Sequence, residues 1–291
     1  MPSLISAGSK PVRLTVLHTN DTHSNIDPFP ANHGKYPGQG GVSSRAATVE
    51  KIRSEEDNVL LLDSGDIFQG TPYFNKFHGV LEMKALSAMK YDAATLGNHD
   101  FDIGMQGFLD AAQHADFPFV NANYDLSETV LSERVKPYTI IKRGGVKIGV
   151  FGVGINLEGL VPAQNTAGMV YNDPIPVAQK IANELREQEK CDLVICLSHI
   201  GYEYDTSQVS DRVLAAATDN IDLILGGHTH TFLERPEMLK NKSGGDVLVN
   251  QVGYAGLFLG RIDLEFSKNG LAVLNQTSIA LHAGEEVLDK A

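Results

Sequence analysis

Side chains that can bind metal ions recur at five separate places along this chain. They are carboxylates, one amide and several imidazoles, with no cysteine among them: Asp21, His23, Asp66, Asn98, His199, His228 and His230. Oxygen and imidazole donors suit Zn²⁺, Mn²⁺, Fe or Co better than Ca²⁺, and the set holds too many histidines for Mg²⁺. Seven ligands exceed the needs of one tetrahedral ion. The set therefore predicts two divalent ions, which one aspartate can bridge at a separation of about 3.5–4 Å.

Each group of ligands directly follows a short apolar run that has the character of a β-strand. These runs are Leu14–His18, Val59–Asp63, Ala93–Leu96, Asp192–Ser198 and Ile221–Gly226. In an open α/β sheet, ligands bind beyond the carboxyl ends of the strands. We therefore expect the five groups to converge on one cavity. A glycine precedes Asp66, Asn98 and His228, which permits sharp turns and close approach of the backbone.

The segments between these runs predict helices, which makes the chain an α/β protein. Apolar residues recur at intervals of three and four in Val42–Arg53, Gly79–Met89, Met105–His114, Val177–Glu189 and Val209–Ala217. Two further strands are expected at Phe119–Asn121 and Val146–Val153, and the long loop Asp27–Gly41 is expected to rim a site. The last sixty residues predict antiparallel strands that close the fold at Val247–Val252, Leu257–Phe266 and Leu271–Ala280, with a turn at 268–270.

Each motif has an ordinary structural explanation when it is taken alone. An Asp-x-His sequence after a strand is common turn chemistry, Asn98 or Asp100 could cap a helix, and paired histidines can simply face solvent. Five such motifs in this order are not explained by five independent accidents. The combination favours a functional site.

Composition excludes several other classes of protein. With 291 residues, 42% hydrophobic and 21% charged, the chain is of ordinary globular composition. The net charge of −12 argues against binding to duplex nucleic acid through a basic face. Apolar runs are far shorter than the roughly 18 residues of a membrane span. Cys191 and Cys196 are predicted to lie on one strand, too far apart to form a disulfide with each other.

The motifs together resemble the calcineurin-like metallophosphatases, and in particular the catalytic domain of the 5′-nucleotidase/UDP-sugar hydrolase family. They read HTNDTH at 18–23, DSGD at 63–66, GNHDFD at 97–102, SHIG at 198–201 and GHTH at 227–230. The resemblance implies a four-layer α/β/β/α sandwich with a dinuclear centre between two sheets. It also implies the metal ligands, which are Asp21, His23 and His230 for one ion, Asn98, His199 and His228 for the other, and Asp66 as the bridge. Some relatives carry glutamine at the place of His230.

The resemblance further implies hydrolysis of a phosphoester, most directly a nucleoside monophosphate, by in-line attack of metal-bound hydroxide. His99 would form a dyad with Asp102 and donate to the phosphoryl group or the leaving oxygen, with Asn98 and His99 contacting the substrate. The alternative for Asp102 is an N-cap of the following helix, and Asp100 is expected to support the ligands from behind. Tyr202 and Tyr204 could line the cavity, and His18 is expected to pack beneath it.

Other activities remain open at this point. The same centre could serve a phosphodiesterase, a 2′,3′-cyclic nucleotide or UDP-sugar hydrolase, or a relative that acts on sulfur esters. A non-catalytic binding module that retained its metals is a further alternative, but such a module would not need His99 and Asp102.

The resemblance also carries expectations about organisation and location. We expect a signal-peptide remnant or disordered terminus at 1–10, a metallophosphatase domain at 11–282, and a tail or the start of a linker helix at 283–291. We expect the nucleotide-binding C-terminal domain of the family to lie outside this sequence. Either the sequence is a piece of a longer protein, or the natural protein has one domain and could work with a separately encoded partner. A periplasmic or extracellular location is expected, with neither a membrane span nor duplex nucleic acid as a partner.

Overall fold

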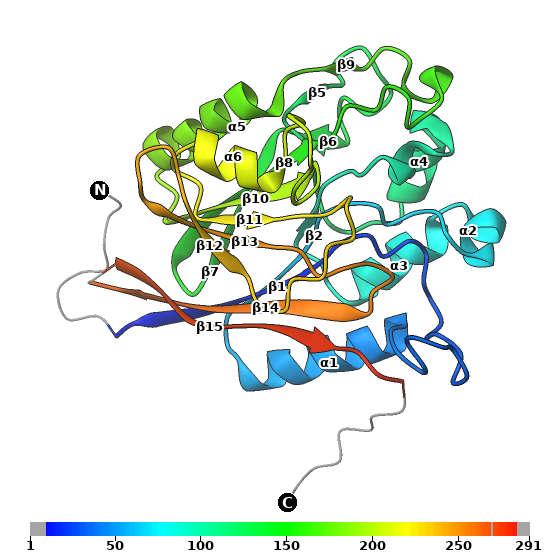
Figure 1. Cartoon of the computed structure of the whole chain (residues 1–291), viewed down its shortest axis with the longest axis horizontal. Coiled ribbons are helices and arrows are strands. Elements are labelled where there is room, and N and C mark those ends of the chain that lie inside the picture. Colours follow the sequence, from blue (N-terminus) through cyan, green and yellow to red (C-terminus); the bar gives the residue numbers. More distant parts are fainter. Residues whose placement is uncertain (1–9, 269, 284–291) are drawn as a thin grey trace, which may run out of the picture.

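The computed structural model describes residues 10–268 and 270–283. The expectations for residues 1–9 and 284–291, and for Asn269 in the predicted turn, lie outside these ranges. Within them the chain forms two large β-sheets with helices on either side (Figure 1). None of the helices in these ranges has the length and apolar character needed to cross a lipid bilayer.

The first sheet has seven strands and contains the N-terminal strand near its centre. Its spatial order is β15-β14-β1-β2-β3-β4-β6. Strands β1, β2, β3, β4 and β6 pair in parallel, while β14 runs antiparallel to both β1 and β15. The bounds are β1 Val12–Thr19, β2 Val59–Asp63, β3 Ala93–Ala94, β4 Phe119–Val120, β6 Val135–Lys136, β14 Phe258–Ser267 and β15 Gly270–Ala280.

The second sheet has six strands in the order β12-β13-β11-β10-β8-β7. The inner strands β8, β10, β11 and β13 are parallel, and the two edge strands are antiparallel to their neighbours. The bounds are β7 Tyr138–Arg143, β8 Val146–Gly154, β10 Leu193–His199, β11 Leu223–Leu225, β12 Glu237–Lys240 and β13 Asp246–Asn250. A separate two-stranded sheet pairs β5, Tyr124–Asp125, with β9, Val170–Tyr171.

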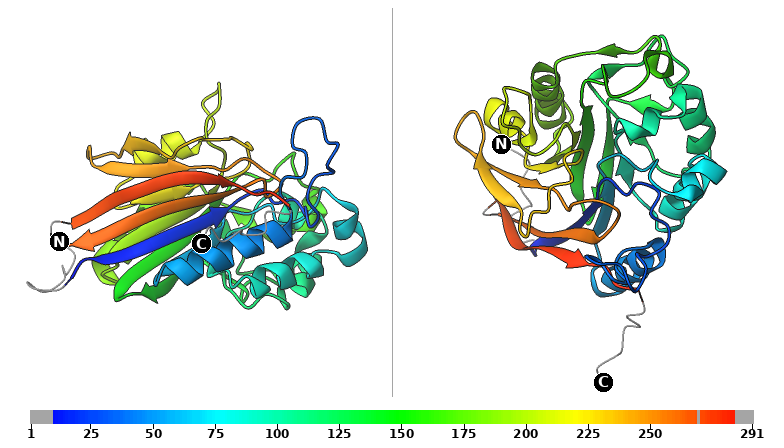
Figure 2. Two further views of the ribbon diagram at one scale, coloured as in Figure 1. Left: turned by 90° about the horizontal axis from the view of Figure 1, so that it is seen from below. Right: turned by 45° about the vertical axis from the view of Figure 1, so that its right-hand side comes forward.

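Three apolar clusters hold these elements together. One cluster combines Leu62 of β2 with Val150 of β8 and Leu197 of β10, so it lies between the two large sheets. A second packs α1, α3 and α4 on the seven-stranded sheet, and a third packs α5 and α6 on the six-stranded sheet. The helices are α1 Val42–Glu55, α2 Pro72–Phe77, α3 Val80–Ala88, α4 Gly104–Ala112, α5 Pro174–Asn183 and α6 Asp211–Ala217, with single turns η1 His99–Phe101, η2 Ala163–Thr166 and η3 Glu184–Gln188. Figure 2 shows the two helical groups on the outside of the sheets.

The predicted elements are present, and their differences from the structure have local causes. The segment expected as one helix at Val177–Glu189 is α5 followed by a single π-helical turn, and α5 begins earlier because the Asp173 carboxylate accepts the N–H of Ile175. The segment expected at Val247–Val252 is β13, which pairs antiparallel with β12, as expected, but also in parallel with β11, so it belongs to the second sheet and not to the closing strands. The closing antiparallel pair is therefore β14 and β15 alone.

Helix α2 and the strands β5, β6, β7, β9 and β12 were missed because they are short or their sequence pattern is weak. Helix α2 is only six residues long and is organised by Pro72 at its first position. Strand β7 is an edge strand that pairs only with β8, and its side chains are mostly half-buried, so neither alternation nor a continuous apolar run marks it. The two cysteines are free, as expected.

Truncation of an inter-sheet side chain tests this architecture. Leu62 is fully buried between the sheets, so we expect Leu62→Ala to destabilise the fold by about 2–5 kcal/mol through lost burial and the cavity left behind. Urea unfolding measures this change. Leu274→Ala is the matched control, because Leu274 on β15 is 47% exposed, and its free energy of unfolding should change by less than about 0.5 kcal/mol. Equal effects of the two substitutions would contradict the assigned core.

Candidate functional site

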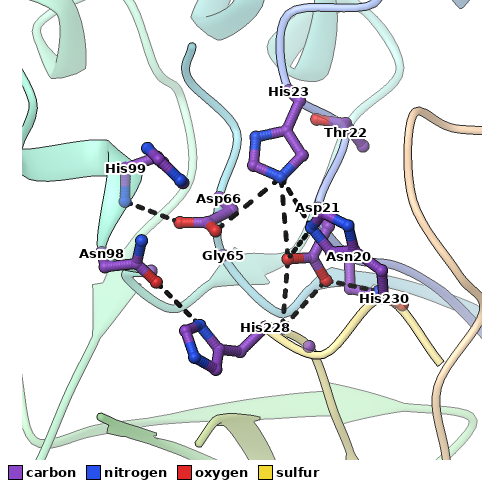
Figure 3. A network of polar contacts seen from close by, with 12 residues as sticks. Asn20, Asp21, Thr22, His23, Gly65, Asp66, Asn98, His99, His228 and His230 are labelled. Atoms are coloured by element: carbon purple, nitrogen blue, oxygen red, sulfur yellow. Dashed lines mark hydrogen bonds and ion pairs between the residues drawn. The ribbon is translucent and has the colours of Figure 1, made fainter. Parts of the chain in front are cut away.

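The carboxyl ends of β1, β2, β3, β10 and β11 meet at one place in the molecule. The ends of these strands and the loops that follow them carry all seven side chains predicted as metal ligands. Figure 3 shows most of this cluster, in which Asp66 and Asp21 are surrounded by imidazoles. The convergence expected from the sequence is thus present in the structure.

Three of these side chains form a first group that could hold a metal ion. Asp21, His23 and His230 each present a donor atom, and these atoms lie within 4.8 Å of one another. The Nε2 atoms of His23 and His230 are 3.0 Å apart. Asp21 Oδ1 lies 3.4 Å from Nε2 of His230 and 3.9 Å from Nε2 of His23.

Asp66, His199 and His228 form a second group with the same spacing. His199 Nε2 lies 3.1 Å from Asp66 Oδ2, and His228 Nδ1 lies 2.8 Å from Oδ1 of Asn98, which brings the amide into this group. Asp66 Oδ2 is also 3.8 Å from Nε2 of His23 in the first group. The Asp66 carboxylate therefore lies between the two groups, which is the placement that a bridging ligand needs.

The hydrogen bonds of the histidines leave donor atoms that a cation could bind. Nδ1 of His199 lies 2.7 Å from the carbonyl oxygen of Ser64, and Nδ1 of His23 lies 3.2 Å from that of Phe68. A carbonyl only accepts, so in the neutral rings these Nδ1 atoms carry the hydrogen and Nε2 presents a lone pair. His199 Nε2 is buried and makes no well-aligned hydrogen bond, although Asp66 Oδ2 is close. A divalent cation would satisfy these facing lone pairs.

A proton competes with a metal ion for the same position. Burial is the largest single influence on His199 and disfavours its charged form, but the charges of Asp66 and Asp21 and the hydrogen bonds to Asp66 and Ser64 together outweigh it and raise the pKa of His199 to about 10. Burial lowers the pKa of His228 to about 4, so that ring is neutral and ready to coordinate. Because a ligand nitrogen must be deprotonated, binding of a metal ion at this site would release protons and would weaken as the pH falls.

The backbone around the candidate ligands is strained. Asp21, His23, Asp66, His228 and His230 all have positive φ, between 47° and 77°. Non-glycine residues adopt this region at a cost of order 1–3 kcal/mol each, and such residues concentrate at functional sites. Gly97 permits the close approach expected of it, because a Cβ at this position would overlap Oδ1 of Asp66.

Asp100 supports the ligand loops from behind, as the sequence predicted. Its carboxylate accepts the backbone N–H groups of Gly97, Asp66, Ile67 and Phe68 at 2.8 to 3.2 Å. These four bonds join the loop after β2 to the loop after β3. Asp100 therefore orients Asp66 and Asn98 without facing the cavity.

The segment between β13 and β14 supports two other ligand loops, and the sequence did not reveal it. Gln251 donates through Nε2 to the carbonyl of Gly227 at 2.6 Å and accepts from the N–H of Thr231. Asn20 donates through Nδ2 to Oδ2 of Asp21 and to the carbonyl of Gly253, each at 2.6 Å. Tyr254 stacks on His230 with ring centroids 5.0 Å apart. The only available signal was a polar residue, Gln251, directly after a strand.

The loop Asp27–Gly41 reaches this same region. Its Tyr36 makes an edge contact with Tyr254, with ring centroids 6.4 Å apart, and Tyr254 in turn contacts His230. The loop thus lies near the candidate ligands, as expected for a segment that rims a site.

His99 and Asp102 form the predicted pair. His99 Nδ1 lies 2.8 Å from Oδ2 of Asp102, and the backbone N–H of His99 donates to Oδ1 of Asp66 at 2.8 Å. The hydrogen bond to Asp102 raises the pKa of His99, which favours the imidazolium. The alternative role for Asp102 is excluded, because α4 has Ile103 at its N-cap position and no side-chain cap.

The remaining residues singled out from the sequence separate into two sets. His18 is fully buried at the end of β1, where its Nε2 lies 2.7 Å from Nδ2 of Asn250, so it packs beneath the site as expected. Tyr204 lines a groove that also contains His228, whereas Tyr202 is not among the residues that line it and instead bonds through its hydroxyl to Glu237.

Comparison with known proteins connects this geometry with a family. Residues 14–232 match the family model of the calcineurin-like phosphoesterases. The chain is 34% identical over 286 residues to the snake venom 5′-nucleotidase of Crotalus adamanteus, covering 91% of this chain and 47% of that protein. It is 32% identical to the trifunctional nucleotide phosphoesterase protein YfkN of Bacillus subtilis, covering 92% of this chain and 19% of that protein. The chain thus spans about half the length of the nucleotidase relatives, and less of the trifunctional one.

A solved structure agrees with the sequence comparison. The 5′-nucleotidase precursor of Thermus thermophilus superimposes with a TM-score of 0.82 at 31% identity, covering 93% of this chain and 55% of that one. The mixed α/β fold, the converging donors and the matched family model lead to one conclusion. This chain belongs to the calcineurin-like phosphoesterase family.

Proposed function

We propose that this protein is a metal-dependent phosphoester hydrolase that converts a nucleoside 5′-monophosphate and water to a nucleoside and phosphate. The observation that carries the proposal is the pair of donor groups around Asp66 with the His99–Asp102 pair beside it. Two divalent cations would be held by Asp21, His23 and His230 and by Asn98, His199 and His228, with Asp66 between them. The names of the relatives, 5′-nucleotidases from several animals, support the choice of substrate.

The cations, when bound, would supply a net local charge of about +2 against the carboxylates of Asp21 and Asp66, attract the phosphoryl oxygens and acidify a water for in-line attack. This chain's own residues do the rest. The carboxylates of Asp66 and Asp21 would hold the two cations, and Asp100 fixes the loop that carries Asp66. His99, with its pKa raised by Asp102, holds a proton at Nε2 that it can donate to a phosphoryl oxygen or to the leaving oxygen.

A second candidate activity is hydrolysis of phosphodiesters, such as cyclic nucleotides, or of nucleotide sugars at the same centre. The similarity to a protein named a trifunctional nucleotide phosphoesterase favours this candidate. An assay with AMP, a 2′,3′-cyclic nucleotide, UDP-glucose and bis-p-nitrophenyl phosphate, each with Mn²⁺ or Zn²⁺, distinguishes the two activities. Absence of hydrolysis of every compound would instead favour the non-catalytic binding module.

We also propose that residues 11–282 act as one catalytic domain and that the protein works outside the cytoplasm, in the periplasm or the extracellular space. Relatives named as snake venom 5′-nucleotidases and as a nucleotidase precursor support the location. Fractionation of the native host, with detection by an antibody against this chain, tests it.

Substitution of the proposed acid tests the role of His99. His99→Asn should retain both metal ions, since His99 belongs to neither donor group, but should lower kcat by roughly 10²–10⁴-fold because the proton donor is lost. Steady-state kinetics on AMP with saturating Mn²⁺ measures this change. Unchanged turnover in this variant would refute the role.

The pH profile tests the contribution of Asp102. The active imidazolium is lost as the pH rises through the pKa of His99, and the hydrogen bond to Asp102 raises that pKa. In Asp102→Asn the pKa of His99 should fall, so the alkaline limb of the kcat profile should move to lower pH. A limb that stays in place would show that Asp102 does not act through His99.

Loss of the carboxylate between the groups tests the metal assignment. Asp66→Asn removes one negative charge from both groups, so the purified variant should hold fewer than two divalent ions per chain. Elemental analysis after gel filtration in metal-free buffer measures the content. His99→Asn is the matched control, and a full complement of ions in both variants would contradict the assignment.

A further inference from the structure

A small cavity of about 10 Å³ lies between the loop that follows β1 and the helices α1 and α3. The loop contributes residues 22 and 24–26 to its lining, α1 contributes Arg45, and α3 contributes Glu82. The loop residues of the lining flank His23, which belongs to the first donor group. The cavity therefore adjoins the segment that presents candidate metal ligands.

Two groups of opposite charge are buried at this cavity without hydrogen-bond partners. Arg45 is 3% exposed and Glu82 is 2% exposed. Atoms Nε and Nη1 of Arg45 and both carboxylate oxygens of Glu82 are buried and accept or donate no hydrogen bond among the described residues. The hydroxyl oxygen of Ser24 is buried and unpartnered in the same way. Because unpaired polar atoms are costly to bury, these three groups require a partner between them.

One water molecule fits both the volume and the character of the lining. A water needs roughly 10–15 Å³ of such space, and internal waters make about three hydrogen bonds. The guanidinium of Arg45 donates, the carboxylate of Glu82 accepts, and the hydroxyl of Ser24 can do either. A metal ion would face the positive charge of Arg45, and an anion would face the carboxylate of Glu82. The cavity therefore suits a neutral molecule.

The loop beside the cavity is strained and is held firmly on one side only. His23 and Ser24 have positive φ values of 47° and 51°. Their backbone N–H groups donate to the carbonyls of Asp66 and Ile67 at 3.0 and 2.9 Å, which attaches the loop to the segment after β2. Within the described structure, no direct hydrogen bond joins residues 22–24 to α1 or α3. A bridge through the cavity would supply that second attachment.

We propose that one internal water joins Arg45, Glu82 and Ser24, and that this bridge holds the loop in the conformation that presents Asp21 and His23 to a cation. Arg45 and Glu82 are then positioning residues, because they act on the first donor group only through the loop. The inference rests on the proposed metal centre and adds to it a cause for the placement of two ligands.

Glu82 is the better charged position at which to test the bridge. Arg45 also acts on Asp63 at the end of β2. Burial is the largest influence on Asp63 and raises its pKa to about 7, and the positive charge of Arg45 is among the influences that lower it. Substitution of Arg45 would therefore disturb two buried groups, whereas substitution of Glu82 breaks no direct hydrogen bond of the described residues.

Mn²⁺ titration of the metal-free protein tests the positioning role. Glu82→Met removes both acceptor oxygens at similar side-chain length. One of the two Mn²⁺ dissociation constants should rise about tenfold, as for other groups that support metal ligands, and the other should change by less than about twofold. Glu82→Gln retains an acceptor oxygen and should recover most of the affinity. Glu50→Met, at an exposed position of α1, is the matched control.

A second measurement distinguishes positioning from general loss of structure. At saturating Mn²⁺, kcat of Glu82→Met on AMP should return to within about twofold of the value for the unmodified chain. Equal rises of both dissociation constants, no rise in either, or a kcat that excess Mn²⁺ does not restore would overturn the positioning role.

Ser24→Ala tests the bridge with a smaller change, and it keeps the test available where Glu82→Met does not fold. The variant removes only the hydroxyl oxygen, so the same dissociation constant should rise by about threefold or more. Ser87→Ala on α3 is the matched control, because its hydroxyl donates to the carbonyl of Met83 and does not line the cavity. Equal constants in the two serine variants would overturn the bridge.

The water itself is tested without any metal ion. A crystal structure of the unmodified chain in metal-free buffer should show one ordered water within about 3.2 Å of polar atoms of Arg45, Glu82 and Ser24. Direct contact of Arg45 with Glu82, or a cavity without water, would overturn the proposal.

Failure of the metal centre is distinguishable from failure of the bridge. A chain that binds neither Mn²⁺ nor Zn²⁺ refutes the metal centre, and NMR of the metal-free protein then reports on the loop. The ring resonances of His23 should shift in Ser24→Ala and stay in place in Ser87→Ala. Resonances that are the same in both variants would overturn the bridge.

Discussion

The candidate site of this protein depends on one constraint: electron-rich donor atoms are held close together around Asp66, although they repel one another. Nε2 of His23 and Nε2 of His199 approach the same carboxylate oxygen, at 3.8 and 3.1 Å, while the backbone carbonyls behind the rings occupy their Nδ1 atoms. Without positive charge this arrangement is unfavourable, and it is satisfied only by protons or by cations. The surrounding structure must therefore hold the donors together before any ion binds.

The two sheets provide that support. The parallel strands of both sheets end at the same edge. The apolar cluster between the sheets fixes the position of one set of strand ends relative to the other. The Asp100 side chain then joins the loop after β2 to the loop after β3, and the Gln251 side chain holds the loop after β11, in both cases through hydrogen bonds to backbone groups. The positive φ values of five candidate ligands show the local cost of this convergence, which the packed sheets offset.

The donor groups and the neighbouring groove differ in their chemical character. At the centre, burial and opposing charges shift the pKa values of His199 and His228 in opposite directions. Beside it, the groove next to His228 is neutral or acidic and carries aromatic surface. The two regions therefore differ in charge and in polarity.

The sequence alone determined the donor types, their order and the strand ends that carry them, because an apolar run followed by polar residues is a local signal. The resemblance of these motifs to a known family also implied the His99–Asp102 pair, and the sequence suggested the supporting role of Asp100. The tertiary structure decided that β13 joins the second sheet, and that Gln251 and Tyr254 contact loops distant from them in the chain. It also formed the groove at Tyr204. These features arise from contacts between segments far apart in the sequence, whose relative positions are set by the packing of the two sheets rather than by any local pattern.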